Sequence, residues 1–292
     1  MKRIFLFVLT NLAILLVLSI VAQITGLDAW LAQQGGSLES LLVFSAFFGF
    51  SGSLISLALS KWMAVRAMGV RIIEEPASAN EQWLLATVSS LATKAGIGMP
   101  QVGMFDSPQP NAFATGARRD HALVAVSTGL LGAMERDEIE AVLGHEVTHV
   151  ANGDMVTLTL IQGVVNTFVF FLSRIVGNIV DRSISRDSEG RGPAYLITVL
   201  VSQLVLGILA SVIVMWFSRQ REFRADAGGA HLAGRERMIA ALERLKAAHD
   251  DPLPSHFSAF GISGGEGQGL RRLFMSHPPI EERIAALRAA AP

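Results

Sequence analysis

Four long apolar runs constrain this chain more than any other feature of its sequence. They cover residues 4–24, 41–59, 155–180 and 195–217, and the only charged residue within them is Arg174. About 20 apolar residues in a helix span the hydrocarbon core of a bilayer. The whole chain has 17% charged residues, whereas soluble domains average about 25%. We therefore expect a mainly α membrane protein with four transmembrane helices.

Some of these runs allow a second interpretation. Lys2 and Arg3 precede the first run, as in a secretory signal, but a cleavable signal has a shorter apolar core of about 7–15 residues. The last two runs could form a buried hairpin or a hairpin that only enters the bilayer, although their length favours spans. Arg174 lies near the end of the third run, from where its side chain could reach water by snorkelling.

Small residues recur at every fourth position of the second run, at Ser45, Gly49 and Ser53. Residues four apart share one face of a helix, and small residues there allow a neighbouring helix to approach closely. Small residues are also common in membrane spans, so the pattern by itself leaves both interpretations open.

Lysine and arginine are unevenly distributed around the runs. They precede the first run and follow the second and fourth, and residues 25–39 contain none. The positive-inside rule then predicts that the N-terminus, the middle segment and the C-terminus lie in the cytoplasm. Residues 181–193 argue against this topology, because they carry three arginines on the side predicted to be outside.

Two polar segments separate the runs and predict how the chain is organised. We expect two transmembrane helices in residues 1–65, one half of a soluble domain in 66–154, a transmembrane hairpin in 155–217, and the other half in 218–292. Apolar spacing and turn residues predict helices at 80–94, 137–150, 219–233, 235–248 and 280–290, strands at 100–104, 111–115 and 123–127, and a loop at 253–269. The helix at 219–233 is expected to continue the fourth run.

Composition excludes several classes of function. The chain has no cysteine, which excludes thiol nucleophiles, iron–sulfur clusters and cysteine zinc sites. Its net charge of −1 gives no global field that would favour nucleic acid, so we expect no such partner. Any bound metal must be held by histidine or carboxylate side chains.

The sequence His145-Glu146-Val147-Thr148-His149 is an HExxH motif. On a helix, positions i and i+4 lie on one face, so the two imidazoles can bind one zinc ion at about 2.0–2.1 Å. The carboxylate of Glu146 can reach a water beside the metal without ligating the metal, which suits a general base. A chance match on an amphipathic helix is the alternative for the motif alone.

A catalytic zinc normally takes three protein ligands and leaves one position open. No third histidine follows at close spacing, but Glu222 and Asp226 lie four residues apart beyond the two last apolar runs. Glu222 could ligate the metal, and Asp226 could accept a hydrogen bond from a ligand histidine. An even number of membrane crossings would place both halves of this site on one side of the membrane.

These motifs together resemble the HtpX family of bacterial membrane metalloproteases and, more distantly, the CAAX prenyl endopeptidases. The resemblance extends over the four apolar runs and rests on HExxH followed by Asn152-Gly153-Asp154, on Glu222-Phe223-x-Ala225-Asp226, on the stretch 111–116, and on Ser276-His277-Pro278-Pro279 with Arg283. It implies a gluzincin-type α+β zinc protease domain with a small sheet, carried on a four-helix membrane anchor. It also implies one zinc ion per chain, a place in the bacterial inner membrane, and cleavage of damaged or misassembled membrane proteins on the cytoplasmic side.

The resemblance further implies roles for two other regions. His277 would donate a hydrogen bond to the developing oxyanion, although a histidine beside prolines could also cap the last helix. Asn111, Ala112, Phe113 and Ala114 would bind an extended substrate by backbone pairing, although they could also form an ordinary loop. Membrane lipids and membrane-protein substrates are the expected partners, and the sequence predicts no oligomeric state.

Two rival classes of function were weighed. A zinc-stabilised membrane scaffold or chaperone partner would need His145, His149 and Glu222 but could dispense with Glu146, which is present. A transporter would need ionisable or broken helices at mid-membrane, and the apolar runs offer almost none. A membrane-anchored zinc endopeptidase is therefore the favoured hypothesis.

Overall fold

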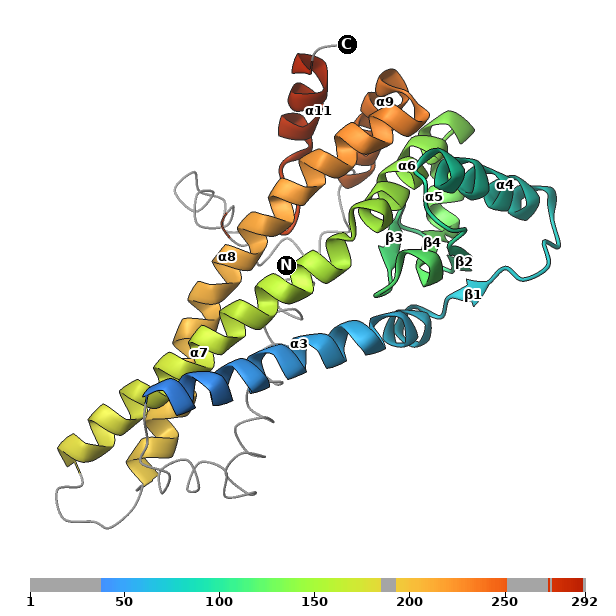
Figure 1. The fold of residues 1–292 in the computed structure, drawn as a ribbon. Coiled ribbons are helices and arrows are strands. Elements are labelled where there is room, and N and C mark those ends of the chain that lie inside the picture. The colour runs from blue at the N-terminus through green and yellow to red at the C-terminus, as the bar shows by residue number, and fades with distance from the viewer. Residues whose placement is uncertain (1–37, 185–192, 251–272, 274, 291–292) are drawn as a thin grey trace. The chain divides into compact units, whose positions relative to one another are not determined.

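The computed structural model describes residues 38–184, 193–250, 273 and 275–290. The apolar run at 4–24 and the loop expected at 253–269 lie outside these residues. Within the described part, three helices are long and apolar enough to cross a membrane: α3 (Leu38–Met68), α7 (Asp154–Ile184) and α8 (Pro193–Ala233) (Figure 1). They correspond to the second, third and fourth apolar runs, and α8 continues past the fourth run without a break, as expected.

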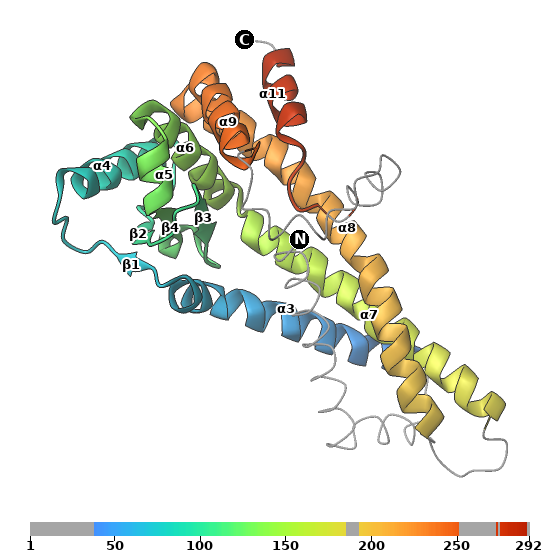
Figure 2. The same ribbon diagram turned by 180° about the vertical axis from the view of Figure 1, so that it is seen from behind.

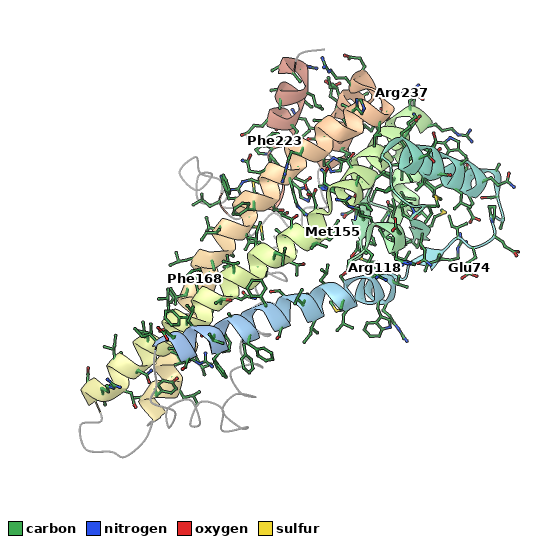
Figure 3. All side chains as sticks on the ribbon, viewed as in Figure 1. Glu74, Arg118, Met155, Phe168, Phe223 and Arg237 are labelled. Carbon is green, nitrogen blue, oxygen red and sulfur yellow. The ribbon has the colours of Figure 1, made fainter. Side chains whose placement is uncertain are left out.

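The chain divides into two compact units. The first contains α3 as far as Ser56, α7 from Leu158 and α8 as far as Phe217. Large apolar side chains, such as Phe168 on α7, are exposed on these helices (Figure 3), which suits contact with lipid. The second unit contains residues 57–157, 218–272 and 277–292.

Gly49 confirms that the small residues of α3 form a contact face. A Cβ atom at this position would lie 2.6 Å from the backbone nitrogen of Thr167 on α7 and 2.9 Å from the carbonyl oxygen of Gly163. Ser45 and Ser53 on the same face are buried. Only a glycine lets the two helix backbones approach this closely.

The snorkelling suggested for Arg174 is wrong. Its side chain is buried, with 2% of the residue exposed, and its guanidinium carbon lies 3.9 Å from the centre of the Phe170 ring. The Phe44 ring of α3 lies 5.6 Å away. These aromatic faces attract the cation, and the position of Phe44 beside α7 is a tertiary contact that sequence spacing does not show.

The second unit contains a four-stranded sheet in the order β1-β2-β4-β3 (Figure 2). Its strands are β1 (Arg71–Ile72), β2 (Gln101–Phe105), β3 (Ala112–Thr115) and β4 (Leu123–Ser127). β2 and β4 pair in parallel, and the other pairs are antiparallel. β4 is buried along its whole length, whereas β3 is an edge strand. The three strands expected from the sequence are confirmed. β1 was not predicted, because a strand of two residues is too short to show alternating apolar and polar side chains.

Within the described residues, five further α-helices belong to this unit. They are α4 (Ala79–Lys94), α5 (Thr128–Ala133), α6 (Arg136–Asn152), α9 (Arg235–Asp250) and α11 (Ile280–Ala289), with a short 3-10 turn at Arg119–His121. α6 packs against α4, α9, β3 and β4. The main core between these elements includes Leu84, Leu130, Leu143 and Leu242. The expected helices lie within two residues of the observed bounds, and α5 and the 3-10 turn were not predicted.

Capping groups fix where α6 begins and ends. Glu135 and Glu138 form a capping box at its start, which satisfies two backbone donors that a helix leaves unpaired. Gly153 ends it with a φ of 69°, a left-handed conformation that glycine adopts without steric cost. The HExxH residues therefore occupy the last two turns of a helix that the core holds from several sides.

Candidate metal centre

His145 and His149 lie one turn apart on the same face of α6. Their Nε2 atoms are 3.1 Å apart, and their rings meet edge to face with centroids 4.6 Å apart. Both side chains are buried. The i, i+4 spacing of the motif thus brings two imidazole nitrogens to one point, as the sequence predicted.

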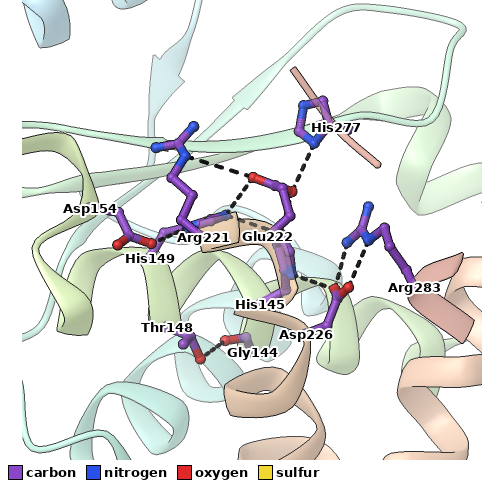
Figure 4. Close-up of polar contacts among 10 residues, drawn as sticks. All are labelled: Gly144, His145, Thr148, His149, Asp154, Arg221, Glu222, Asp226, His277 and Arg283. Carbon is purple, nitrogen blue, oxygen red and sulfur yellow. Dashed lines mark hydrogen bonds and ion pairs between the residues drawn. The ribbon is translucent and has the colours of Figure 1, made fainter. Parts of the chain in front are cut away.

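Helix α8 brings Glu222 to the same point. A Cβ atom on Gly229 would lie 2.9 Å from the backbone nitrogen of His145, so a glycine is required where α8 crosses α6. Glu222 is fully buried, and its Oε2 and Oε1 lie 3.5 Å from His145 Nε2 and 3.4 Å from His149 Nε2 respectively (Figure 4). The three candidate ligands predicted from the sequence therefore form one cluster.

A carboxylate lies beside the outer nitrogen of each histidine. Asp226 Oδ1 is 2.9 Å from Nδ1 of His145, although Nδ1 is poorly aligned for a hydrogen bond, and Asp154 Oδ2 is 2.6 Å from Nδ1 of His149. A carboxylate at this position holds the proton on Nδ1 and leaves the lone pair on Nε2. When both rings are neutral, the two Nε2 lone pairs then face each other and the Glu222 carboxylate.

This donor set fits a zinc ion. Ligand atoms bound tetrahedrally at about 2.0–2.1 Å lie about 3.3 Å from one another, and the three separations here are 3.1, 3.4 and 3.5 Å. Glu222 Oε1 is buried and has no hydrogen-bond donor in the described part of the chain. Three convergent acceptors repel one another unless a cation lies among them, and nitrogen and carboxylate ligands suit zinc.

The electrostatics of the cluster favour positive charge. Burial lowers the pKa of His145, but its contacts with Asp226 and Glu222 outweigh this effect and raise the pKa to about 9. The pKa of His149 is also raised, because its contacts with Asp154 and Glu222 outweigh burial. Burial would raise the pKa of Glu222, but three histidine contacts hold that pKa well below the usual range. A metal must displace the protons that this site attracts, so metal binding here is linked to pH.

His277, in the segment that leads into α11, and Arg283, on α11 itself, approach the cluster. His277 Nδ1 lies 2.8 Å from Glu222 Oε2, and its side chain is 54% exposed. Arg283 donates two hydrogen bonds to Asp226. His277 therefore contacts a candidate ligand directly, whereas Arg283 supports the carboxylate behind His145.

Glu146 is the remaining residue of the HExxH motif. It is partly exposed, unlike its neighbours on α6. Within the described residues it has no hydrogen bond or ion pair, so its carboxylate is available to a water or a substrate. This is the condition that a general base has to meet.

The residues expected to bind substrate lie at the edge of the sheet. Ala112, Phe113 and Ala114 pair with β4 on one side only, and β3 packs against α6. Asn111 precedes the strand, and its backbone exchanges hydrogen bonds with Ser127. Among the described strands none covers the outer edge of β3, so its backbone groups are open to an added strand.

A pocket of about 330 Å³ lies beyond the end of β3. Its walls are the loop from Gly116 to Arg119, the end of α6 including His149, and the first turn of α7 from Met155. Arg118 and Met155 can be followed in Figure 3. The pocket therefore adjoins one of the candidate ligands.

Comparison with known proteins agrees with this geometry. The model of Peptidase family M48 matches residues 78–291. The chain belongs to peptidase family M48. The match covers β2, β3, β4, α6 and the part of α8 that carries Glu222, so the described site lies within the M48 region.

M48 relatives match the chain over nearly its full length. Protease HtpX homolog of Thiobacillus denitrificans is 65% identical over 289 residues, and Protease HtpX of Thioalkalivibrio sulfidiphilus is 64% identical over 292 residues, with 99% of each chain covered. The crystal structure of S. mikatae Ste24p superposes with a TM-score of 0.60 at 19% identity, covering 93% of this chain and 67% of that chain. The resemblance to the HtpX family is confirmed, and the more distant likeness to CAAX endopeptidases is one of fold.

Two residues beside the candidate ligands were not predicted from the sequence. Asp154 stands in the quoted Asn152-Gly153-Asp154 stretch, but its contact with His149 depends on the turn at Gly153. Arg221 directly precedes Glu222, and its guanidinium Nε lies 3.9 Å from Glu222 Oε1. Adjacency to a candidate ligand was the available signal for Arg221 alone, because Asp154 is five residues from His149.

Proposed function

We propose that this M48 peptidase is a zinc-dependent endopeptidase that cleaves damaged or misfolded membrane proteins on the cytoplasmic side of the bacterial inner membrane. The observation that carries the proposal is the convergence of two Nε2 lone pairs and one carboxylate 3.1–3.5 Å apart, with the unengaged carboxylate of Glu146 one position along α6. The site residues then take the roles of three ligands and one base.

The chemistry follows from these positions. His145, His149 and Glu222 would hold the zinc ion, which would supply Lewis-acid polarisation of a substrate carbonyl and activation of a water. Glu146 takes the proton of the attacking water and returns it to the leaving amine. Asp154 and Asp226 keep both ligand histidines in the tautomer that presents Nε2.

Substrate binding is assigned to the sheet edge and to His277. A peptide added to β3 as a further strand is held by backbone hydrogen bonds, which makes binding largely independent of sequence. That mode suits unfolded segments of many different proteins. Nε2, the other nitrogen of the exposed His277 ring, donates a hydrogen bond to the developing oxyanion.

The choice of membrane proteins as substrates rests on the apolar helices of the chain itself. Helices α3, α7 and α8 have the length and hydropathy of membrane spans, so a protease attached to them meets substrates in the plane of the bilayer. The cytoplasmic orientation rests on the positive charges that flank both halves of the site.

Cleavage by the purified full-length protein tests the catalytic part of the proposal. The protein in detergent should degrade an unfolded membrane protein, lose this activity on treatment with a chelator, and recover it when zinc is added back. A zinc-stabilised scaffold would bind the substrate and the metal without producing fragments, which would reject the proposal.

The orientation has its own test, because the natural chain has no cysteine. Ala133 is exposed at the end of α5, so Ala133→Cys should be labelled by a membrane-impermeant maleimide only after the cells are broken. Labelling of intact cells with a permeabilised outer membrane would place the site outside the cytoplasm.

A further inference from the structure

Arg221 carries donors that the described site does not use. Its side chain is 18% exposed, and its Nε and Nη1 atoms are buried with no hydrogen-bond acceptor in the described part of the chain. Three other side chains around the candidate ligands have partners: His149 contacts Asp154, His277 contacts Glu222, and Arg283 contacts Asp226. Arg221 differs from them, because two of its buried donors have no acceptor in the described part of the chain.

Unpaired buried donors need an explanation. A buried N–H without an acceptor is costly, and the cost is greater on a charged group. The nearest anionic atom is Glu222 Oε1, at 3.9 Å from Nε, which is too far for a hydrogen bond. An ion pair with the ligand therefore does not satisfy these donors, and an acceptor from outside the chain would.

The position of the guanidinium indicates which acceptor it meets. Arg221 and His277 lie on either side of the Glu222 carboxylate (Figure 4). Glu222 Oε1, the anionic atom nearest to Arg221, is 3.4 Å from His149 Nε2. The unpaired donors of Arg221 therefore lie beside the candidate metal ligands. A peptide that reaches the ligand cluster brings its carbonyl oxygens to this place, and these are acceptors without a full charge of their own.

We propose that Arg221 is a further catalytic residue, whose guanidinium donates to a peptide carbonyl oxygen of the bound substrate and stabilises the negative charge that develops there. This inference rests on the proposed function. It gives the site two donors for the reacting peptide, Arg221 on one side of Glu222 and His277 on the other. A charged donor that already stands in a buried site needs no reorganisation as the charge develops.

Arg221→Met tests this assignment, because methionine keeps much of the apolar stem and removes every donor. We expect kcat to fall by about 10²–10³-fold, as when one oxyanion donor is removed, with a much smaller change in KM. The affinity for a phosphinic peptide, a mimic of the tetrahedral transition state, should fall by the same factor as kcat/KM. Zinc content should stay at one per chain, and the melting temperature should stay level or rise, since an unpaired buried charge is removed.

Arg224→Met is the matched control. Arg224 lies one turn further along α8 and is exposed, so its loss should leave all five measured quantities unchanged. If Arg221→Met fails to fold, Arg221→Lys replaces it in the comparison. Lysine keeps the positive charge but lacks the planar pair of N–H donors of the guanidinium. For this variant we expect a drop in kcat of about 10-fold with normal zinc content.

Three results would overturn the inference. Near-wild-type kcat in Arg221→Met would remove Arg221 from the reaction, and zinc loss in proportion to lost activity would assign it to holding Glu222. A defect confined to substrates with a free C-terminal carboxylate, and absent from amidated ones, would assign it to terminal recognition instead. Failure of the proposed function can be distinguished from these results, because the wild-type protein with full zinc would then cleave no substrate.

Discussion

Arg283 donates two hydrogen bonds to Asp226, from Nε to Oδ2 at 2.7 Å and from Nη2 to Oδ1 at 2.5 Å. The same Oδ1 lies 2.9 Å from Nδ1 of His145. Through one carboxylate, α11 is therefore connected to a candidate metal ligand on α6. Burial opposes the charge on Asp226, but the contacts with Arg283 and His145 outweigh it and lower the pKa of Asp226.

Arg283→Met should destabilise the protein strongly, because it leaves the Asp226 carboxylate buried with no cationic partner of fixed charge. Breaking a buried pair by removing one member costs about 3–5 kcal/mol. The control is Arg288→Met on the same helix, whose partner Glu243 is 2.8 Å away and exposed, so about 0–1 kcal/mol is expected. Thermal unfolding in detergent measures both, and equal shifts for the two variants would contradict the buried role of Arg283.

Replacing His145, His149 or Glu222 by alanine should each abolish stable zinc binding, because two ligands hold the ion far less well than three. Elemental analysis of purified protein measures the metal content. His231→Ala is the control, since His231 lies exposed on α8 and takes no part in the cluster. Full zinc content in all three ligand variants would mean that the metal lies elsewhere.

His277→Ala should lower kcat by about 10²–10³-fold if its ring stabilises the oxyanion. The melting temperature should change little, because the side chain is more than half exposed. If His277 instead serves the last helix, the variant should lose about 1 kcal/mol of stability and keep its turnover. Kinetics and thermal unfolding on one zinc-loaded preparation separate the two roles.

Glu81 should make the stability of the soluble unit depend on acid pH. Its carboxylate accepts hydrogen bonds from the Ala77 backbone at 2.7 Å and from Arg71 at 2.5 Å, and these lower the pKa of Glu81. Because the folded-state pKa lies below the unfolded value of about 4.3, the stabilisation is complete above that pH and is lost as the pH falls through the folded-state pKa. The melting temperatures of wild type and Glu81→Gln should differ at pH 7 and converge only as the pH falls through the folded-state pKa.

Glu74→Gln is the control for this pH dependence, since Glu74 is exposed nearby and should leave the curve unchanged. A difference between wild type and Glu81→Gln that persisted at low pH would show that the effect is not due to ionisation of Glu81.

Local periodicity made much of this structure predictable. The positions of His145 and His149 follow from helical spacing alone, and the glycine face of α3 follows from the same rule. Glu222 was identified only because an acidic motif follows the last apolar run. Its distance from His145 is set by tertiary packing, which depends on the close helix contact at Gly229. Motifs therefore identified the ligands, while the fold was needed to show that they meet.

The missed features share a physical cause. Asp154 reaches His149 through the left-handed turn at Gly153, and Arg174 is buried against the ring of Phe44 on another helix. Neither contact has a period or a composition that a sequence displays. The strand β1 and the helix α5 were missed because elements of two and six residues are too short to show one.

The most direct test of the central claim is the rate of substrate cleavage by Glu146→Gln at full zinc occupancy. The amide keeps the size of the side chain and can hydrogen-bond to water, but it cannot take a proton. We predict one zinc per chain, as in the wild type, with cleavage of an unfolded membrane protein reduced by about 10²–10⁴-fold. Near-wild-type turnover by the zinc-loaded variant would contradict the account, because Glu146 would then not be the base of this site.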